Sequence, residues 1–390
     1  MTTAQIDEVL NGAVERHEIP GVVAMAVGED GVFYEGAFGV RALPDGTAMT
    51  MDTVFRIASM TKAITSVAAL QLVEQGKLTL DDPVPPIDPA LAKPQVFALF
   101  DRAGRPILRP ARRAITLRHL LTHTAGFTYE IWNPNTLKYN AVSKVPPLSS
   151  GRRAALRMPL MFDPGERWEY GINIDWVGRL VEEVSGQPLD AYMRDHIFTP
   201  LGMKDTGFRP SDEQRARQAT IHQRDGGALV PQPFEELTTP EFWAGGGGLY
   251  STAADYIAFL QMLLHGGAHH GAIVLSRETV KMLGENQIGK LHAGIMRTTT
   301  PARSENVNFF PDIPVRWGLA TLINEMRGPS GRSMGSLSWA GLFNTYYWLD
   351  PVRRIAAVIL TQILPFADKV AVKVYGEYER AICETVDGMS

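Results

Sequence analysis

The segment 59–75 is the feature that most constrains this chain, because it is long enough to form a helix and almost free of charge. Only Lys62 and Glu74 are charged in it, and Gly76 follows where helices commonly end in glycine. A helix this apolar, and short for a membrane span, is expected to run through the protein interior. The sequence therefore predicts a central helix with a buried amine at Lys62.

Ser59 precedes that lysine by three residues, which places the hydroxyl and the amine on one helical face. Burial favours a neutral amine, so Lys62 is a candidate general base near neutral pH. The free N–H groups and the dipole of a first helical turn favour developing negative charge. The pattern predicts a nucleophile, a base and part of an oxyanion hole. Ser-x-x-Lys also arises by chance, however, and a serine at a helix start is more often only a cap.

The composition narrows the class of protein. A length of 390 residues suggests two to three domain-sized units, and a net charge of −4 without long like-charge runs gives no case for a nucleic-acid or membrane partner. The single cysteine, Cys383, excludes an internal disulfide framework and is expected to be a buried thiol. The first residues show no signal-peptide pattern, so we expect a cytoplasmic protein. We expect no cofactor and no metal, and homo-oligomerisation is not readable from the sequence.

Strand-like patterns gather near the two chain ends, with a largely helical, proline-rich middle between them. We expect an α+β fold in which an antiparallel sheet flanked by helices, from residues 1–77 and 249–390, carries an inserted, mostly helical domain, 78–248. The glycines 245–248 are expected to form a flexible loop. Expected strands are 22–27, 32–36, 54–58, 317–323, 336–339, 346–349 and 354–361, and expected helices include 4–17, 115–123, 173–185 and 366–386.

Two further segments complete the candidate site. Tyr170 stands in the turn before a predicted helix, where its phenolic oxygen is stabilised as an anion or as a hydrogen-bond donor. Trp339, Ala340 and Gly341 end a predicted edge strand; the glycine allows a substrate to approach closely, and the next N–H, on Leu342, would complete an oxyanion hole. Taken singly, such a tyrosine is usually a surface or packing residue, and such a tryptophan a core aromatic.

In this order the three segments resemble the serine β-lactamase and penicillin-recognising superfamily, specifically the branch that joins class C β-lactamases with family VIII carboxylesterases. The resemblance covers nearly the whole chain, including Leu-Leu-Thr-His-Thr-Ala-Gly at 120–126. It implies the following roles: Ser59 as nucleophile, Lys62 as its basic partner, Tyr170 as proton relay, and the N–H groups of Ser59 and Leu342 as oxyanion hole.

This chain departs from class C β-lactamases in two motifs. Their Tyr-x-Asn asparagine is replaced by Ile172, and Asn173 comes one residue late, where we expect it to cap a helix. Their Lys-Thr-Gly lysine, which helps to bind the β-lactam carboxylate, is replaced by Trp339, and Trp-Ala-Gly is close to the Trp-Gly-Gly of the esterases. Losing a cation and an amide removes groups that recognise a charged substrate. We therefore expect a small-molecule ester, mostly uncharged and with a short acyl chain.

Aromatic residues of the inserted segment are expected to line the acyl or alcohol pocket, although core packing is the commoner role for each. These residues are Phe127, Tyr129, Trp132, Tyr139 and Trp243.

The expected chemistry is attack by Ser59 on the ester, followed by hydrolysis of the acyl-enzyme. Whether Lys62 or Tyr170 is the base stays open at the sequence level. Four alternatives also stay open: a β-lactamase, a D-aminopeptidase-like amidase, an acyltransferase using the same residues, and a silent binding module on this fold.

Other motifs give weaker hypotheses. Ser333 lies in a Gly-x-Ser-x-Gly pattern, but a strand rather than a helix is expected after it and no histidine follows it, so we interpret it as a turn residue. Two histidine groups have some metal-ligand spacing, but both lack the Glu of His-Glu-x-x-His and an obvious third ligand. These groups are His119 with His123, and His265 with His269 and His270.

Overall fold

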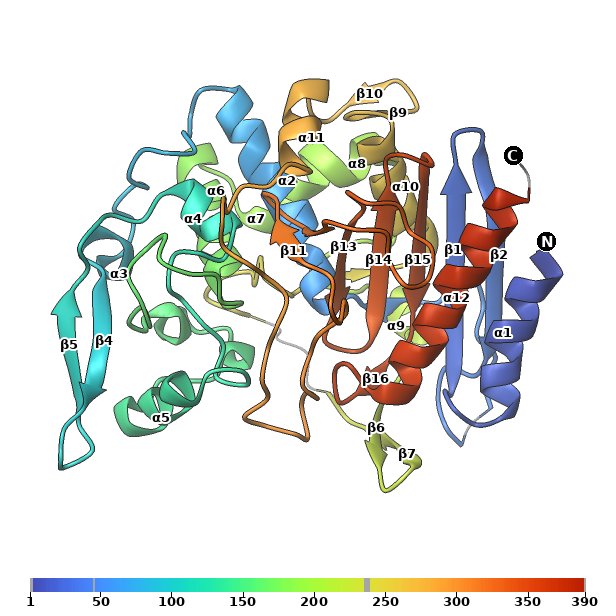
Figure 1. Cartoon of the computed structure of the whole chain (residues 1–390), viewed down its shortest axis with the longest axis horizontal. Helices are drawn as coiled ribbons and strands as arrows, with labels where there is room; N and C mark the ends of the chain where they lie inside the picture. The colour runs from blue at the N-terminus through green and yellow to red at the C-terminus, as the bar shows by residue number, and fades with distance from the viewer. Residues whose placement is uncertain (1–2, 45, 235–238, 389–390) are drawn as a thin grey trace.

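The computed structural model describes residues 3–44, 46–234 and 239–388, and its centre is a seven-stranded antiparallel sheet (Figure 1). The strand order is β11-β12-β13-β14-β15-β1-β2, so both ends of the chain build one sheet, as predicted. The strands are β1 (Gly21–Gly28), β2 (Gly31–Gly39), β11 (Val315–Trp317), β12 (Leu322–Asn324), β13 (Leu337–Gly341), β14 (Thr345–Asp350) and β15 (Ile355–Leu360).

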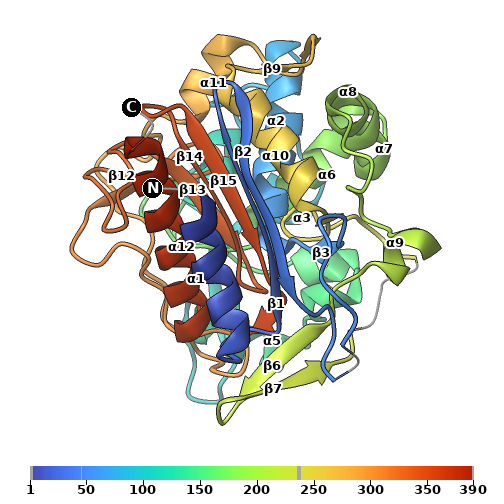
Figure 2. The ribbon, with the colours of Figure 1, turned by 90° about the vertical axis from the view of Figure 1, so that its right-hand side faces the viewer.

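Helices cover both faces of the sheet (Figure 2). On one face, α1 (Thr3–Glu15) and α12 (Lys369–Asp387) lie side by side, and the other face carries α2 (Thr61–Glu74) and α10 (Ala253–Leu264). The α1 helix turns Ile6, Leu10 and Ala13 inward, which is the amphipathic spacing that the sequence shows. The α+β class predicted from the sequence is confirmed.

The α2 helix runs through the interior. All of its residues from Thr61 to Leu72 are buried, and a 3₁₀ turn, η1 (Ala58–Met60), leads into it. Gly76 has a φ of +68° just beyond its end, a conformation that glycine adopts without steric cost. Because protein surrounds the helix from Thr61 to Leu72, the side chain of Lys62 is withdrawn from water, with 1% of its surface exposed.

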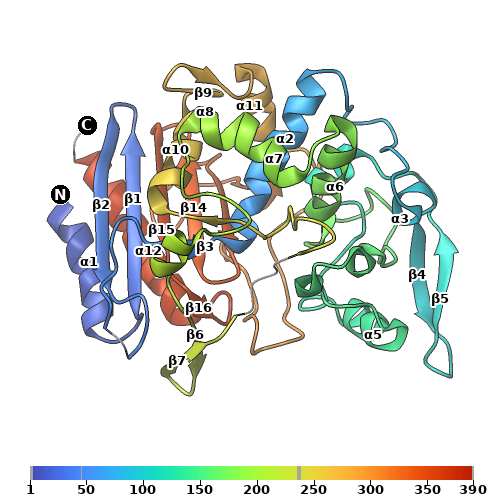
Figure 3. The same ribbon diagram turned by 180° about the vertical axis from the view of Figure 1, so that it is seen from behind.

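The middle of the chain holds more helix than strand, but it also holds strands that were not predicted. The hairpin of β4 (Gln95–Phe100) and β5 (Pro106–Pro110) projects from one end of the molecule (Figures 1 and 3), and β6 (Ile221–Asp225) pairs with β7 (Ala228–Gln232). β5 and β7 contain prolines, which in a sequence argue against a central strand. Both are edge strands, where proline is tolerated, so the pattern did not reveal them. These two hairpins were therefore not predicted from the sequence.

The remaining elements are short apart from α5 and α6, and α6 has the predicted bounds. They are β3 (Phe55–Arg56), α3 (Pro89–Ala92), α4 (Leu117–Leu121), α5 (Pro134–Ser143), η2 (Leu148–Ser150), η3 (Arg153–Leu156), α6 (Asn173–Ser185), α7 (Leu189–Met193), η4 (Arg194–Phe198), α8 (Thr199–Leu201), α9 (Asp212–Ala216), β8 (Tyr250–Ser251), β9 (Ala268–His269), β10 (Ala272–Ile273), α11 (Arg277–Leu283) and β16 (Ile363–Leu364).

One predicted strand, 317–323, is two. β11 and β12 pair antiparallel and a turn joins them, because the chain reverses at Gly318. A Cβ at Gly318 would lie 2.1 Å from the carbonyl oxygen of Leu283, so only glycine fits there. Among the described residues, no helix is both long enough and apolar enough to cross a bilayer.

Candidate active site

Ser59 and Lys62 lie one helical turn apart at the start of α2. The Nζ atom of Lys62 donates hydrogen bonds to Ser59 Oγ at 3.2 Å, to the Tyr129 hydroxyl at 3.1 Å and to the carbonyl oxygen of Gly246 at 2.6 Å. All three partners are uncharged. The amine is therefore held in place by dipoles rather than by a direct ion pair.

Tyr170 joins the pair from the turn before α6. Its phenol hydrogen-bonds with Ser59 and accepts a hydrogen bond from the indole N–H of Trp339 at 2.9 Å. The Lys62 Nζ atom lies 4.8 Å from the centre of the Tyr170 ring. The structure thus brings together Ser59, Lys62, Tyr170 and Trp339, which the sequence singled out from distant segments.

Burial moves the proton affinities of the amine and the phenol in opposite directions. Desolvation lowers the pKa of Lys62 to about 7, although the charge of Asp175 opposes it. Desolvation raises the pKa of Tyr170, although hydrogen bonds with Ser59 and Trp339 oppose it. Near neutral pH the amine is therefore able to accept a proton while the phenol keeps its own.

Asp175 is a buried acid of the site that the sequence analysis missed. Its Oδ1 atom accepts a hydrogen bond from the N–H of Gly246 at 2.9 Å, and the carbonyl of the same glycine holds Lys62. Burial raises the pKa of Asp175, and the nearby charge of Lys62 opposes that rise. The only signal in the sequence was a lone acid on the inward face of a helix, two residues after Asn173.

Gly245, Gly246 and Gly248 pack tightly, contrary to the flexible loop expected, whereas Gly247 is exposed. A Cβ at Gly246 would lie 2.5 Å from Asp175 Oδ2, and one at Gly248 would lie 2.8 Å from the ring of Phe208. Gly246 is therefore required because its backbone must pass between the acid and the amine.

Asn173 does not cap α6, so that prediction was wrong. Ile172 is the N-cap residue, without a side-chain cap, and the Asn173 amide instead donates to the Phe127 carbonyl at 3.0 Å and lies 3.1 Å from His123 Nδ1. The ring of His123 packs 4.7 Å from that of Tyr170, and burial lowers the pKa of this histidine well below its usual range. The amide thus positions the loop behind Tyr170.

Of the five predicted pocket aromatics, two border the site and three lie elsewhere. The rings of Tyr129 and Trp132 lie 5.4 and 5.5 Å from that of Tyr170, so both border the site. Phe127 is fully buried and its ring faces Trp176 at 6.0 Å, which makes it a core residue behind the site. Of the other two aromatics, Tyr139 lies on α5 and Trp243 stacks on Phe208.

β13 is an inner strand rather than the predicted edge strand, but part of it is uncovered. β12 pairs only with Leu337 and Ser338, which leaves Trp339, Ala340 and Gly341 without a neighbouring strand on that side in the described chain. A Cβ at Gly341 would lie 2.2 Å from the carbonyl oxygen of Ile57. The glycine thus lets the end of β13 press against the turn that carries Ser59.

Leu342 begins the turn after β13 and packs on a small apolar cluster that includes Ala58. Ala58 has a φ of +43°, which is unusual for a residue with a side chain and marks local backbone strain. The segment that carries Leu342 therefore packs closely against the turn that carries Ser59.

The weaker motifs lie elsewhere. Ser333 is a turn residue between β12 and β13 and its N–H donates to Asp350, as interpreted from the sequence. His119 closes the capping box of α4 with Thr116. Cys383 is buried in α12, as expected.

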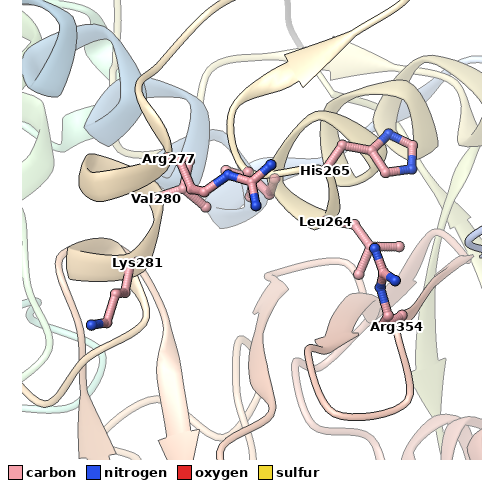
Figure 4. Close-up of a pocket in the computed structure, with 8 residues that line it drawn as sticks. Leu264, His265, Arg277, Val280, Lys281 and Arg354 are labelled. Carbon is pink, nitrogen blue, oxygen red and sulfur yellow. The ribbon is translucent and has the colours of Figure 1, made fainter.

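A separate hollow of about 230 Å³ lies where α10, α11 and the turn before β15 meet (Figure 4). The Glu74 side chain at the end of α2 accepts a hydrogen bond from Ser276, next to this hollow, so the hollow is about 20 Å of helix away from Ser59. Its cations are exposed: Arg354 pairs with Glu29, and Lys281 points away from Arg277. This hollow does not contribute to the site around Ser59.

The fold and this arrangement define the class of protein, the serine hydrolases and acyltransferases of the β-lactamase and penicillin-binding superfamily. The family model described as Beta-lactamase matches residues 6–377, and the chain belongs to that family. The resemblance inferred from the motifs is thereby confirmed.

Several relatives are named as acyltransferases, and one is named as an esterase. The chain is 31% identical to the monacolin J acid methylbutanoyltransferase of Aspergillus terreus over 95% of this chain and 93% of the relative. It is 32% identical to the lovastatin esterase of Penicillium rubens, over 92% and 93% of the two chains. Unliganded simvastatin synthase (LovD) from Aspergillus terreus has the same fold, with a TM-score of 0.83, 29% identity and 98% coverage of each chain.

Proposed function

We propose that this chain is a serine carboxylesterase that hydrolyses small, mostly uncharged esters with short acyl chains. The observation that carries the proposal is the buried amine of Lys62, 3.2 Å from Ser59 Oγ and with a pKa lowered to about 7. Such an amine is partly neutral at physiological pH and can accept the serine proton.

In the proposed mechanism, Ser59 Oγ attacks the carbonyl carbon of the ester while Lys62 takes the hydroxyl proton. The N–H groups of Ser59 and Leu342 stabilise the oxyanion. Tyr170, which keeps its proton, relays a proton to the leaving alcohol as the C–O bond breaks. Water then attacks the acyl-enzyme and the acid is released, with Ser59 recovering its proton.

The proposed substrate preference rests on what faces Tyr170. The indole of Trp339 offers one N–H donor, already used by Tyr170, and no positive charge. Tyr129 and Trp132 add aromatic surface beside it. An uncharged, apolar ester fits such walls better than a β-lactam carboxylate does.

Acyl transfer is a second candidate, favoured by the relatives. Two of them are named methylbutanoyltransferases, and a third is named lovastatin esterase. The same acyl-enzyme serves both reactions, and an alcohol in place of water as second nucleophile yields a new ester.

The test compares p-nitrophenyl butyrate with nitrocefin, and adds benzyl alcohol to the ester reaction. We expect the ester to be turned over far faster than nitrocefin, and Ser59→Ala to lose roughly 10³-fold or more in kcat. Fluorophosphonate should label Ser59 in the native protein and fail to label the Ser59→Ala variant. Benzyl butyrate formed at the expense of butyrate would identify a transferase. Faster nitrocefin turnover would overturn the esterase proposal, and absence of labelling would favour a binding module.

A further inference from the structure

A second cavity, of about 180 Å³, lies between β13 and α12, on the side of β13 that faces away from Ser59. Aromatic rings form much of its wall: Phe309 closes the side next to Trp339, and Tyr346 stacks on Tyr375 at 4.4 Å. A cavity of this size accommodates a single ring with a small substituent. Its lining is mostly apolar and aromatic with a few polar side chains, which is the composition of a small-molecule pocket.

A buried ion pair forms the polar end of this cavity. Arg332 Nε lies 3.0 Å from Glu379 Oε1, and the two residues are 3% and 2% exposed. The Nη1 atom of Arg332 is buried as well and has no hydrogen-bond partner in the described part of the chain. A buried donor left unpaired is costly, and because Arg332 lines the cavity, an acceptor bound there would lower that cost.

A glycine in the middle of α12 keeps the cavity open. Gly376 lines it, and a Cβ built there would meet only Ser330 Oγ, at 3.6 Å. No neighbouring atom therefore requires a glycine at this position, although glycine is unfavourable in a helix interior relative to alanine. Glycine at position 376 therefore lowers the helix propensity of α12 and leaves the space beside it unfilled.

We propose that this cavity is a binding site for a neutral, ring-sized apolar molecule with one hydrogen-bond acceptor oxygen, which Arg332 Nη1 would bind. A neutral ligand is favoured over an anion because Glu379 already balances the charge of Arg332. The site goes beyond the proposed esterase activity and does not depend on it. Its wall includes Trp339, whose indole donates to Tyr170, so the ligand would lie directly behind the candidate active site.

The test measures binding of acetophenone and of ethylbenzene, which differ in the carbonyl oxygen, by calorimetry and saturation-transfer NMR. We use the full chain, both unlabelled and, if fluorophosphonate labels Ser59, labelled, and the Gly376 variants below separate binding in this cavity from binding at the active site. We expect acetophenone to bind at least about tenfold more tightly than ethylbenzene, since the oxygen pairs with a buried donor.

Three variants assign the site. Gly376→Leu should abolish binding of both probes and Gly376→Ala should weaken it, while neither lowers the temperature of unfolding. Arg332→Met with Glu379→Met, which replaces the pair by apolar groups, should keep ethylbenzene binding and lose the preference for acetophenone. Absence of binding of both probes to the unaltered chain, or binding that Gly376→Leu leaves intact, would overturn the proposal.

Discussion

Two buried cations, Lys62 and Arg332, lie near opposite sides of β13 and have opposite electrostatic surroundings. Lys62 contacts only neutral groups, and its acid, Asp175, acts through Gly246. Arg332 touches its acid, Glu379, directly at 3.0 Å. Burial lowers the pKa of both, but contact with Glu379 outweighs burial and leaves the pKa of Arg332 above its ordinary value.

The distance between a buried cation and its acid therefore decides what the cation can do. A direct ion pair fixes the proton on the cation, which suits structure and hydrogen-bond donation. A counter-charge placed one glycine away holds the amine in position without fixing its proton. Lys62 is therefore suited to proton transfer and Arg332 to binding. The predictions below test this contrast.

Lys62→Arg should cause the largest effect. Arginine stays protonated in proteins, so the variant keeps a cation but loses the base, and kcat/KM for p-nitrophenyl butyrate should fall about 10³-fold. The control is Lys93→Arg at an exposed lysine, which should leave the rate unchanged. A Lys62→Arg enzyme as active as the control would show that the amine is not the base.

Arg332→Met should affect stability instead. It leaves Glu379 buried without its partner, so the free energy of unfolding should fall by about 3–5 kcal/mol in a urea titration. Replacing Glu379 by Met as well should restore most of the loss. An unchanged midpoint in the single variant would mean that the pair carries no structural role.

Tyr170→Phe should lower kcat by roughly 10²-fold, because the proton relay is lost while Lys62 and the oxyanion groups remain. Tyr139→Phe, on α5, is the matched control and should behave like the unaltered chain. If kcat/KM of Tyr170→Phe fell only through KM, the phenol would have a binding role and no part in proton transfer.

Asp175→Asn should give the smallest change, a shift of the pH profile. With a Lys62 pKa of about 7, kcat/KM should decline as pH falls through that value, since the amine gains its proton. Removing the negative charge of Asp175 lowers the pKa of Lys62, so the decline should move to lower pH. Glu183→Gln, an exposed acid on the same helix, should not shift the profile.

The sequence predicted the groups of the site well where the signal was local. Ser59 and Lys62 share one turn, and the apolar residues around them require burial whatever surrounds the helix. Tyr170 and Trp339 were found through the resemblance, since nothing local distinguishes them from packing aromatics. That both chain ends build one antiparallel sheet followed from the strand patterns near those ends, whereas the strand order was not predicted.

The surroundings of Lys62 could not be predicted, because they depend on which distant segments meet. No acid lies near Lys62 in the sequence, yet Asp175 on α6 comes close to it in the fold. The N–H of Gly246 donates to Asp175, and the carbonyl of Gly246 accepts from Lys62. A run of four glycines indicates either freedom or close packing, and only the neighbours decide between them. Prolines concealed β5 and β7 in the same way, since a free strand edge tolerates them.

The hydrogen bonds of Lys62 tie together residues 59–62, Tyr129 and Gly246, which are far apart along the chain. During synthesis, the serine is made long before the glycine that holds its amine. A nascent or partly folded chain would therefore carry an inert hydroxyl, and reactivity would appear only when the last of these segments docks. Labelling of Ser59 during refolding would thus time the completion of the native state, later than the recovery of helical circular dichroism.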